Sequence, residues 1–200
     1  ARSWLGEAPD RHGRCALVDA RFLLRAFPPE LCGGRVAGSL GAASINQAMK
    51  IMINDLLVSD IQVIWQTGST DLSIEKKPMK NCWINKFIDK MEYAYAAADV
   101  VICRSGATTL AELTLLGKAA ILVPFPYAAA DHQTFNAKTL VESGAALMIS
   151  DSELNTKLKP ELISLLNDDI KLKKMREASR ALGKPNAGSV IAQNIMKLIK

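Results

Sequence analysis

The sequence predicts an α/β domain with an open, doubly wound parallel sheet of Rossmann-like type and additional helices at its C-terminal end. Three observations lead to this prediction. Short apolar runs of strand length recur along the chain, at residues 61–65, 81–87, 99–103, 119–123 and 145–149. Segments with helical character separate these runs, which is typical of parallel strands joined by crossover helices. After residue 150 only helical patterns remain.

Residues 1–34 differ in composition from the rest of the chain. Six of the nine arginines lie in the first 35 residues, whereas all sixteen lysines lie at Lys50 or beyond. The segment shows no sustained helical or strand period. We therefore expect residues 1–34 to form an atypical, poorly ordered extension that contributes little to the fold. The domain proper is expected at residues 35–200, with the C-terminal helices starting at about residue 151.

The first half of the expected domain begins with a short strand at residues 35–37, directly before the turn at Gly38 and Ser39. Apolar residues then recur at helical spacing from 43 to 57, which predicts an amphipathic helix. The strand at 61–65 ends in Gln66, and the strand at 81–87 leads into a helix that reaches Ala98.

Residues 99–123 are typical of a βαβ unit. A buried strand at 99–103 is followed by a helix from Thr108 to Gly117 and by the strand at 119–123. Two prolines then end the strand, and Asp131 is expected to cap a helix that runs to Ser143. Further on, we expect Pro160 to open a helix to residue 167, followed by helices at 170–182 and 187–199.

The turn between the strand at 99–103 and its helix is a candidate phosphate site. Gly106 lies where the free N–H groups of the first helical turn and the positive end of the helix dipole face outward. Glu112 lies about one turn further in, where it can accept hydrogen bonds from the vicinal hydroxyls of a ribose. Together they predict a sugar-nucleotide site. The alternative is a plain tight turn followed by a solvated glutamate.

Several ordered motifs resemble the C-terminal half of the MurG family, and the likeness runs from about residue 36 to the C-terminus. The motifs are residues 38–42 (GSLGA), 66–68 (QTG), 87–91 (FIDKM), 95–106 (YAAADVVICRSG), Glu112 and 131–136 (DHQTFN). The resemblance implies one half of a GT-B glycosyltransferase that moves N-acetylglucosamine from its UDP donor to lipid I, with inversion. One departure is Ala37, which stands where the family has a glycine and is expected to weaken the phosphate loop.

The resemblance also implies roles for individual residues. Ile88 would contact the uracil through its backbone, with Met91 packed nearby, and Glu112 would bind the ribose. The remaining donor contacts would be Ser39, Gly106, Ala107, Thr108 and Thr109 at the diphosphate and His132, Gln133 and Asn136 at the sugar. Arg104 would stabilise the departing UDP, unless it is a structural partner of the turn. The catalytic base is unassigned, because the family places it and the lipid surface in an N-terminal domain with a glycine-rich loop that is not found in this sequence.

Composition excludes several other classes of function. The net charge of +5 includes no basic stripe with interleaved aromatics, so a nucleic-acid partner is not expected. The two histidines and four cysteines show no metal-ligand spacing, so we expect no metal and no cofactor. The cysteines include no C-x-x-C pair, so we expect them to be reduced thiols in the core. The apolar runs are too short to span a bilayer. We expect a cytoplasmic protein. The basic C-terminal segment would favour peripheral contact with the anionic inner face of the membrane, and the alternative is that its charged helices are only solvated surfaces.

The sequence therefore supports one main hypothesis and two alternatives. The main hypothesis is the UDP-N-acetylglucosamine-binding half of the transferase that converts lipid I to lipid II in peptidoglycan synthesis, inactive without an N-terminal half that binds lipid I. The first alternative is a non-catalytic sugar-nucleotide-binding module. The second is a related GT-B enzyme, either a glycolipid synthase or a nucleotide-sugar epimerase.

Overall fold

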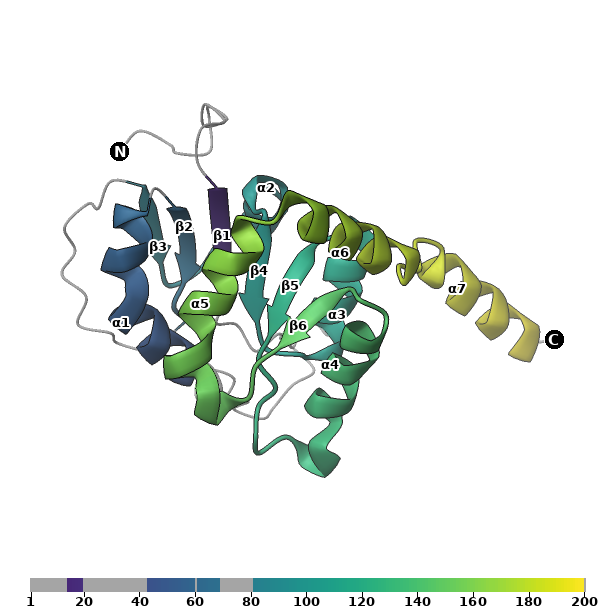
Figure 1. The fold of residues 1–200 in the computed structure, drawn as a ribbon. Coiled ribbons are helices and arrows are strands. Elements are labelled where there is room, and N and C mark those ends of the chain that lie inside the picture. Colours follow the sequence, from purple (N-terminus) through teal and green to yellow (C-terminus); the bar gives the residue numbers. More distant parts are fainter. Residues whose placement is uncertain (1–13, 20–42, 60, 69–80, 200) are drawn as a thin grey trace.

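A computed structural model describes residues 14–19, 43–59, 61–68 and 81–199 (Figure 1). Its centre is a six-stranded sheet in the order β3-β2-β1-β4-β5-β6, and each neighbouring pair is parallel. The strands are β1 (Arg14–Asp19), β2 (Ile61–Gln66), β3 (Cys82–Asn85), β4 (Val100–Cys103), β5 (Ala119–Leu122) and β6 (Ala146–Met148). This confirms the predicted doubly wound α/β fold, and β2 to β6 all lie within the predicted strand segments or one residue beyond them.

Strand β1 corrects the expectation for the N-terminal segment. It lies in the middle of the sheet, where Ala16 is in register with Val63 of β2 and with Val100 of β4. Cys15, Ala16, Leu17 and Val18 are all buried. The expectation that residues 1–34 contribute little to the fold is therefore wrong for residues 14–19. A central strand is buried on both faces and shows no alternation, so its short apolar run carries little periodic signal.

The rest of the N-terminal segment is outside the described residues, and so are the strand expected at 35–37 and the turn with Ala37 and Ser39. The predictions that Ala37 weakens a phosphate loop and that Ser39 holds the diphosphate therefore stay predictions.

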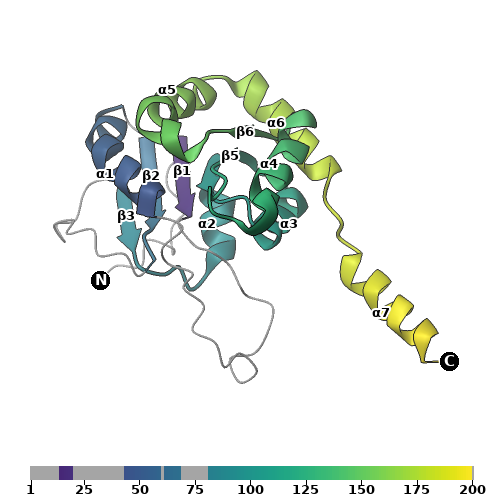
Figure 2. The same ribbon diagram turned by 90° about the horizontal axis from the view of Figure 1, so that it is seen from below.

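Two layers of helices cover the sheet, and each strand divides its side chains between them. Helices α1 (Ala43–Val58), α5 (Leu154–Leu166) and α6 (Asp169–Ala181) pack on one face against residues such as Val18 and Ile102. Helices α2 (Met91–Ala97), α3 (Ala107–Leu116) and α4 (His132–Glu142) pack on the other face against residues such as Leu17 and Cys103. Figure 2 shows α1 and α5 on one side of the strands and α2 and α3 on the other.

Helix α5 begins earlier than predicted. Pro160 was expected to open it, but Pro160 lies inside the helix, which starts at Leu154 after the short 3-10 turn η4 (Asp151–Glu153). A proline in a helix interior removes one backbone hydrogen bond and costs about 3 kcal/mol. Leu154, Leu158, Leu162 and Leu165 are buried in one stripe, at roughly 1.5–3 kcal/mol for each side chain, which outweighs that cost.

Helix α4 begins at the predicted place but without the predicted cap. Asp131 is the N-cap residue, yet its backbone is left-handed (φ 53°) and no side chain caps the helix. Its carboxylate instead accepts a hydrogen bond of 2.6 Å from Thr134 Oγ1. At the other end the helix stops at Glu142, one residue before the predicted Ser143, and Gly144 follows with φ of +71°.

The described cysteines are core residues. Burial, with a smaller contribution from nearby Asp99, raises the pKa of the Cys15 thiol to about 12. Burial also raises the pKa of the Cys82 thiol to about 11, and Cys103 is buried. The thiols of Cys15 and Cys82 therefore stay protonated at neutral pH, which makes them poor nucleophiles.

Helix α7 (Ala187–Leu198) extends away from the sheet in both views (Figures 1 and 2). None of its residues is buried, and its large apolar side chains, including Val190, Ile191 and Ile195, are more than half exposed. None of the described helices combines the length and apolar character needed to cross a membrane.

Candidate functional site

The predicted site residues that the structure describes follow the carboxyl ends of β3, β4 and β5. Strands β2 and β3 follow β1 on one side of the sheet, and β4, β5 and β6 follow it on the other side, so the strand order changes direction between β1 and β4. Ligands of open α/β sheets bind at such a switch point, outside the carboxyl ends of the strands. The topology therefore places the β4–α3 turn beside the position where a ligand is expected.

The N-terminus of α3 is uncapped and open. Gly106 is the N-cap residue, with φ −69° and ψ 142°, and no side chain caps the helix. The first intrahelical bond runs from Leu110 N–H to the Gly106 carbonyl at 3.0 Å, so the N–H groups of residues 107–109 precede it. A Cβ atom built on Gly106 would meet no atom within 4 Å. An anion can therefore approach the backbone at this turn.

The three residues that open α3 differ in exposure. Ala107 is exposed, Thr108 is half-buried and Thr109 is buried. Side-chain contact with a ligand is therefore open to Thr108, whereas Thr109 is placed to contribute through its backbone.

Glu112 of α3 has a specific protein partner. Its Oε2 atom accepts a 2.8 Å hydrogen bond from the hydroxyl of Tyr95, a buried residue of α2. Glu112 itself is half-buried. The alternative that Glu112 is simply a solvated helix residue does not fit these contacts. Tyr95 opens the 95–106 motif and lies one helical turn after Met91, but the sequence alone assigned it no role in the site.

The segment after β3 is held by a side chain at the end of β2. The backbone N–H of Ile88 donates a 2.7 Å hydrogen bond to Gln66 Oε1, and both residues are buried. The backbone group left to Ile88 for a uracil contact is its carbonyl oxygen. Met91, the first residue of α2, is partly buried against the same core as Tyr95.

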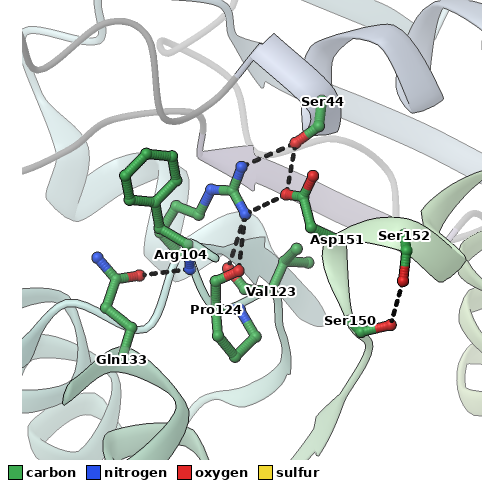
Figure 3. Close-up of polar contacts among 9 residues, drawn as sticks. Ser44, Arg104, Val123, Pro124, Gln133, Ser150, Asp151 and Ser152 are labelled. Atoms are coloured by element: carbon green, nitrogen blue, oxygen red, sulfur yellow. Dashed lines mark hydrogen bonds and ion pairs between the residues drawn. The ribbon is translucent and has the colours of Figure 1, made fainter. Parts of the chain in front are cut away.

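The Arg104 guanidinium is buried and bonded to protein groups (Figure 3). Nη1 donates to the carbonyls of Val123 at 3.2 Å and Pro124 at 3.0 Å and to Asp151 Oδ1 at 2.5 Å. Nη2 donates to Ser44 Oγ at 2.7 Å. Burial lowers the pKa of Arg104, and the bond to Asp151 opposes that change. Of the two roles predicted for Arg104, these contacts favour the structural one.

Helix α4 is tied to the β4–α3 turn by hydrogen bonds. Ser105 Oγ donates to the Gln133 carbonyl at 2.7 Å, and Asn136 Nδ2 donates to the Ser105 carbonyl at 3.1 Å. The structure therefore brings Asn136 and Gln133 next to the β4–α3 turn, and their contact with the sugar stays a prediction. One predicted sugar contact, the Asn136 amide nitrogen, is engaged with the backbone.

The side-chain amide of Gln133 has an unused donor. Its Oε1 accepts from the Phe125 N–H at 3.1 Å, which fixes the amide orientation (Figure 3). Its Nε2 is buried and has no hydrogen-bond partner in the part of the chain that the structure describes. A buried donor without an acceptor is costly, so this nitrogen is suited to an acceptor supplied by a ligand.

His132 is exposed and its tautomer follows from its neighbour. Nδ1 lies 2.7 Å from the Ala129 carbonyl, which can only accept, so Nδ1 carries the proton. In the neutral ring Nε2 is then an acceptor. The two preceding residues, Ala130 and Asp131, both have left-handed backbone (φ 49° and 53°), a strained conformation for residues other than glycine.

A metal centre is not indicated. Within residues 14–19, 43–59, 61–68 and 81–199, no three His, Cys, Asp or Glu side chains are grouped so that they could hold a metal ion.

Comparisons with known proteins agree with this arrangement. Residues 36–194 match the profile of the glycosyltransferase family 28 C-terminal domain. A protein of Prosthecochloris aestuarii named UDP-N-acetylglucosamine--N-acetylmuramyl-(pentapeptide) pyrophosphoryl-undecaprenol N-acetylglucosamine transferase is 46% identical over 165 residues, which are 80% of this chain and 45% of that protein. A protein of Salinibacter ruber with the same name is 40% identical over 214 residues, covering 99% of this chain and 57% of that protein.

The crystal structure of Acinetobacter baumannii MurG has the same fold, with a TM-score of 0.72 and 29% identity, covering 94% of this chain and 51% of that one. The chain thus spans about half the length of the curated relatives it matches. Because the family profile covers most of its residues, this chain belongs to the glycosyltransferase family 28 C-terminal domain family.

Proposed function

We propose that this chain is the donor-binding half of a UDP-N-acetylglucosamine-dependent transferase that converts lipid I to lipid II. The observation that carries this proposal is the open, uncapped N-terminus of α3 with Glu112 about one turn behind it. The names of the relatives point to the same donor and acceptor. The residues proposed to contact the donor are Ser39, Ile88, Met91, Gly106, Ala107, Thr108, Thr109, Glu112, His132, Gln133 and Asn136.

The diphosphate would lie on the N–H groups that open α3. These groups and the helix dipole place positive partial charge where the negative charge of the departing UDP develops. Glu112 would accept from the ribose hydroxyls, and the Ile88 carbonyl would accept from the uracil imide N–H. The unpaired Gln133 Nε2 would donate to an oxygen of the sugar.

The acceptor side of the reaction belongs to the half that this chain does not span. We propose that the catalytic base and the lipid I site lie there, and that the basic C-terminal segment of this chain contacts the anionic inner face of the membrane. One wall of a cleft neither excludes water nor completes the set of acid and base groups. The isolated chain should therefore bind UDP-N-acetylglucosamine weakly and transfer no sugar.

Isothermal titration of the full chain with UDP, UDP-N-acetylglucosamine and UDP-glucose tests this function. We expect heat of binding with the first two ligands and a preference for the N-acetylated sugar over glucose. Adding the N-terminal half of a relative should restore transfer to lipid I, which a non-catalytic module could not do. Absence of UDP binding would contradict the proposal, and rapid transfer by the chain alone would place the base within it, with His132 Nε2 as the first candidate.

Gly106→Ala should weaken UDP binding about fivefold or more without unfolding the protein. The backbone at Gly106 has negative φ and the space beside it is open, so alanine should change the free energy of unfolding by less than about 1 kcal/mol. The added methyl group would stand where a diphosphate approaches the backbone. Titration of UDP and thermal unfolding measure the two effects. Gly188→Ala, also in open space but on α7, is the matched control and should leave UDP affinity unchanged.

A further inference from the structure

The Tyr95–Glu112 hydrogen bond joins the two helices that flank the candidate nucleotide site. Tyr95 lies on α2 and is only 3% exposed, and its ring packs in the core cluster with Leu110 and Leu113 of α3. Its hydroxyl lies 2.8 Å from Glu112 Oε2. Because the ring is enclosed, the hydroxyl has a fixed position from which it can direct the carboxylate.

We propose that Tyr95 is a positioning residue that sets the Glu112 carboxylate for recognition of the ribose diol of a nucleoside diphosphate. This inference rests on the proposed function, since it assigns Glu112 to the ribose. It adds a residue that does not touch the ligand and that acts through Glu112.

The chemistry of the pair suits this role. A phenol that donates to a carboxylate forms a charge-assisted bond and leaves the other lone pairs of the carboxylate available, because an ionised carboxylate has about four acceptor positions. Two vicinal hydroxyls can then donate to those positions. A glutamate that is already held in one rotamer loses less side-chain entropy on binding than a free one.

The position of Tyr95 also connects two parts of the expected ligand. Tyr95 follows Met91 by four residues, so both side chains lie on one face of α2, next to the segment with Ile88. Glu112 lies on α3, the helix that opens at the diphosphate turn. The base and the ribose of a nucleotide are covalently joined, so the spacing between these two protein segments has to be held. The Tyr95–Glu112 bond holds it directly.

A purely structural role makes a different prediction. Buried tyrosine hydroxyls usually need a hydrogen-bond partner, and Glu112 could serve only as that partner. Removal of the hydroxyl would then lower stability and would affect ligands with and without the 2′-hydroxyl equally. The distinguishing quantity is therefore the ratio of the Kd of 2′-deoxy-UDP to the Kd of UDP.

The experiment measures this ratio by isothermal titration for the wild-type chain, Tyr95→Phe, Glu112→Gln and the double variant, with thermal unfolding of each. Tyr93→Phe is the matched control, because Tyr93 is on the same helix but 46% exposed, with Lys90 over its ring. Phenylalanine keeps the buried ring, so Tyr95→Phe should remain folded.

We expect the wild-type ratio to be about ten or more. Tyr95→Phe should lower the ratio about threefold or more, because the Glu112 side chain would then have to be ordered on binding, and ordering one side chain costs a free energy of this scale. Glu112→Gln should bring it close to one, Tyr95→Phe should have no further effect on the ratio in that background, and Tyr93→Phe should match the wild type. An unchanged ratio in Tyr95→Phe would overturn the inference while leaving the proposed function in place. A wild-type chain that does not bind UDP, or does not distinguish it from 2′-deoxy-UDP, would overturn the inference together with the ribose site.

Discussion

Arg104→Ala should lower the free energy of unfolding by about 3 kcal/mol or more, the range for removing one partner of a buried ion pair. The substitution would leave the Asp151 carboxylate without its counter-charge and the carbonyls of Val123 and Pro124 without their donor. Together with Ser44 of α1, which also accepts from the guanidinium, these groups come from three separate segments. Asp151 is 25% exposed, so water recovers part of the loss and the lower end of the range applies. Urea denaturation followed by circular dichroism measures this change.

Arg180→Ala is the matched control for that measurement. Arg180 is exposed on α6, and its guanidinium donates to the Leu116 carbonyl at 3.4 Å. Its removal should cost less than about 1 kcal/mol. If Arg104→Ala cost no more than Arg180→Ala and instead weakened UDP binding about tenfold, Arg104 would be a ligand-contacting residue and the structural assignment would be wrong.

Glu112→Gln should weaken UDP binding by about tenfold or more. Hydrogen bonds from a ligand to a charged group contribute roughly 1.5–3 kcal/mol, and the neutral amide loses most of that strength. The fold should survive, because the amide oxygen of glutamine can still accept from the Tyr95 hydroxyl. Isothermal titration gives the affinity, and a thermal scan checks that the variant is folded.

Glu142→Gln provides the comparison for the same chemical change at an exposed position. Glu142 is the last residue of α4 and is exposed. We expect its replacement to alter UDP affinity by less than about twofold. An equally small effect at Glu112 would mean that the ribose is bound elsewhere, even if the chain binds UDP.

Local pattern was sufficient for most of the fold. The apolar runs that became β2 to β6 are short, bounded by turn residues and separated by helical segments, which is all that a parallel α/β sheet requires. The candidate phosphate site at Gly106 was also predictable from the sequence. A turn with glycine between a strand and a helix places free N–H groups at the carboxyl end of the strand, and this geometry is local. The sequence by itself therefore determined the fold class, the family resemblance and the sheet edge of the candidate site.

Only the tertiary structure decided which residues complete that site. Strand β1 was hidden in a segment of unusual composition, and its place in the middle of the sheet depends on pairing with β2 and β4, which lie far away in the sequence. Glu112 and Tyr95 are 17 residues apart, and Arg104 and Asp151 are 47 apart. Periodicity and capping rules describe neighbours within about one or two turns, so they carry no information on such pairs. The packing of α2 against α3 creates the first of these contacts, and the packing of η4 against the end of β4 creates the second. Tertiary packing therefore decides whether a charged side chain lies in solvent or is held by a partner.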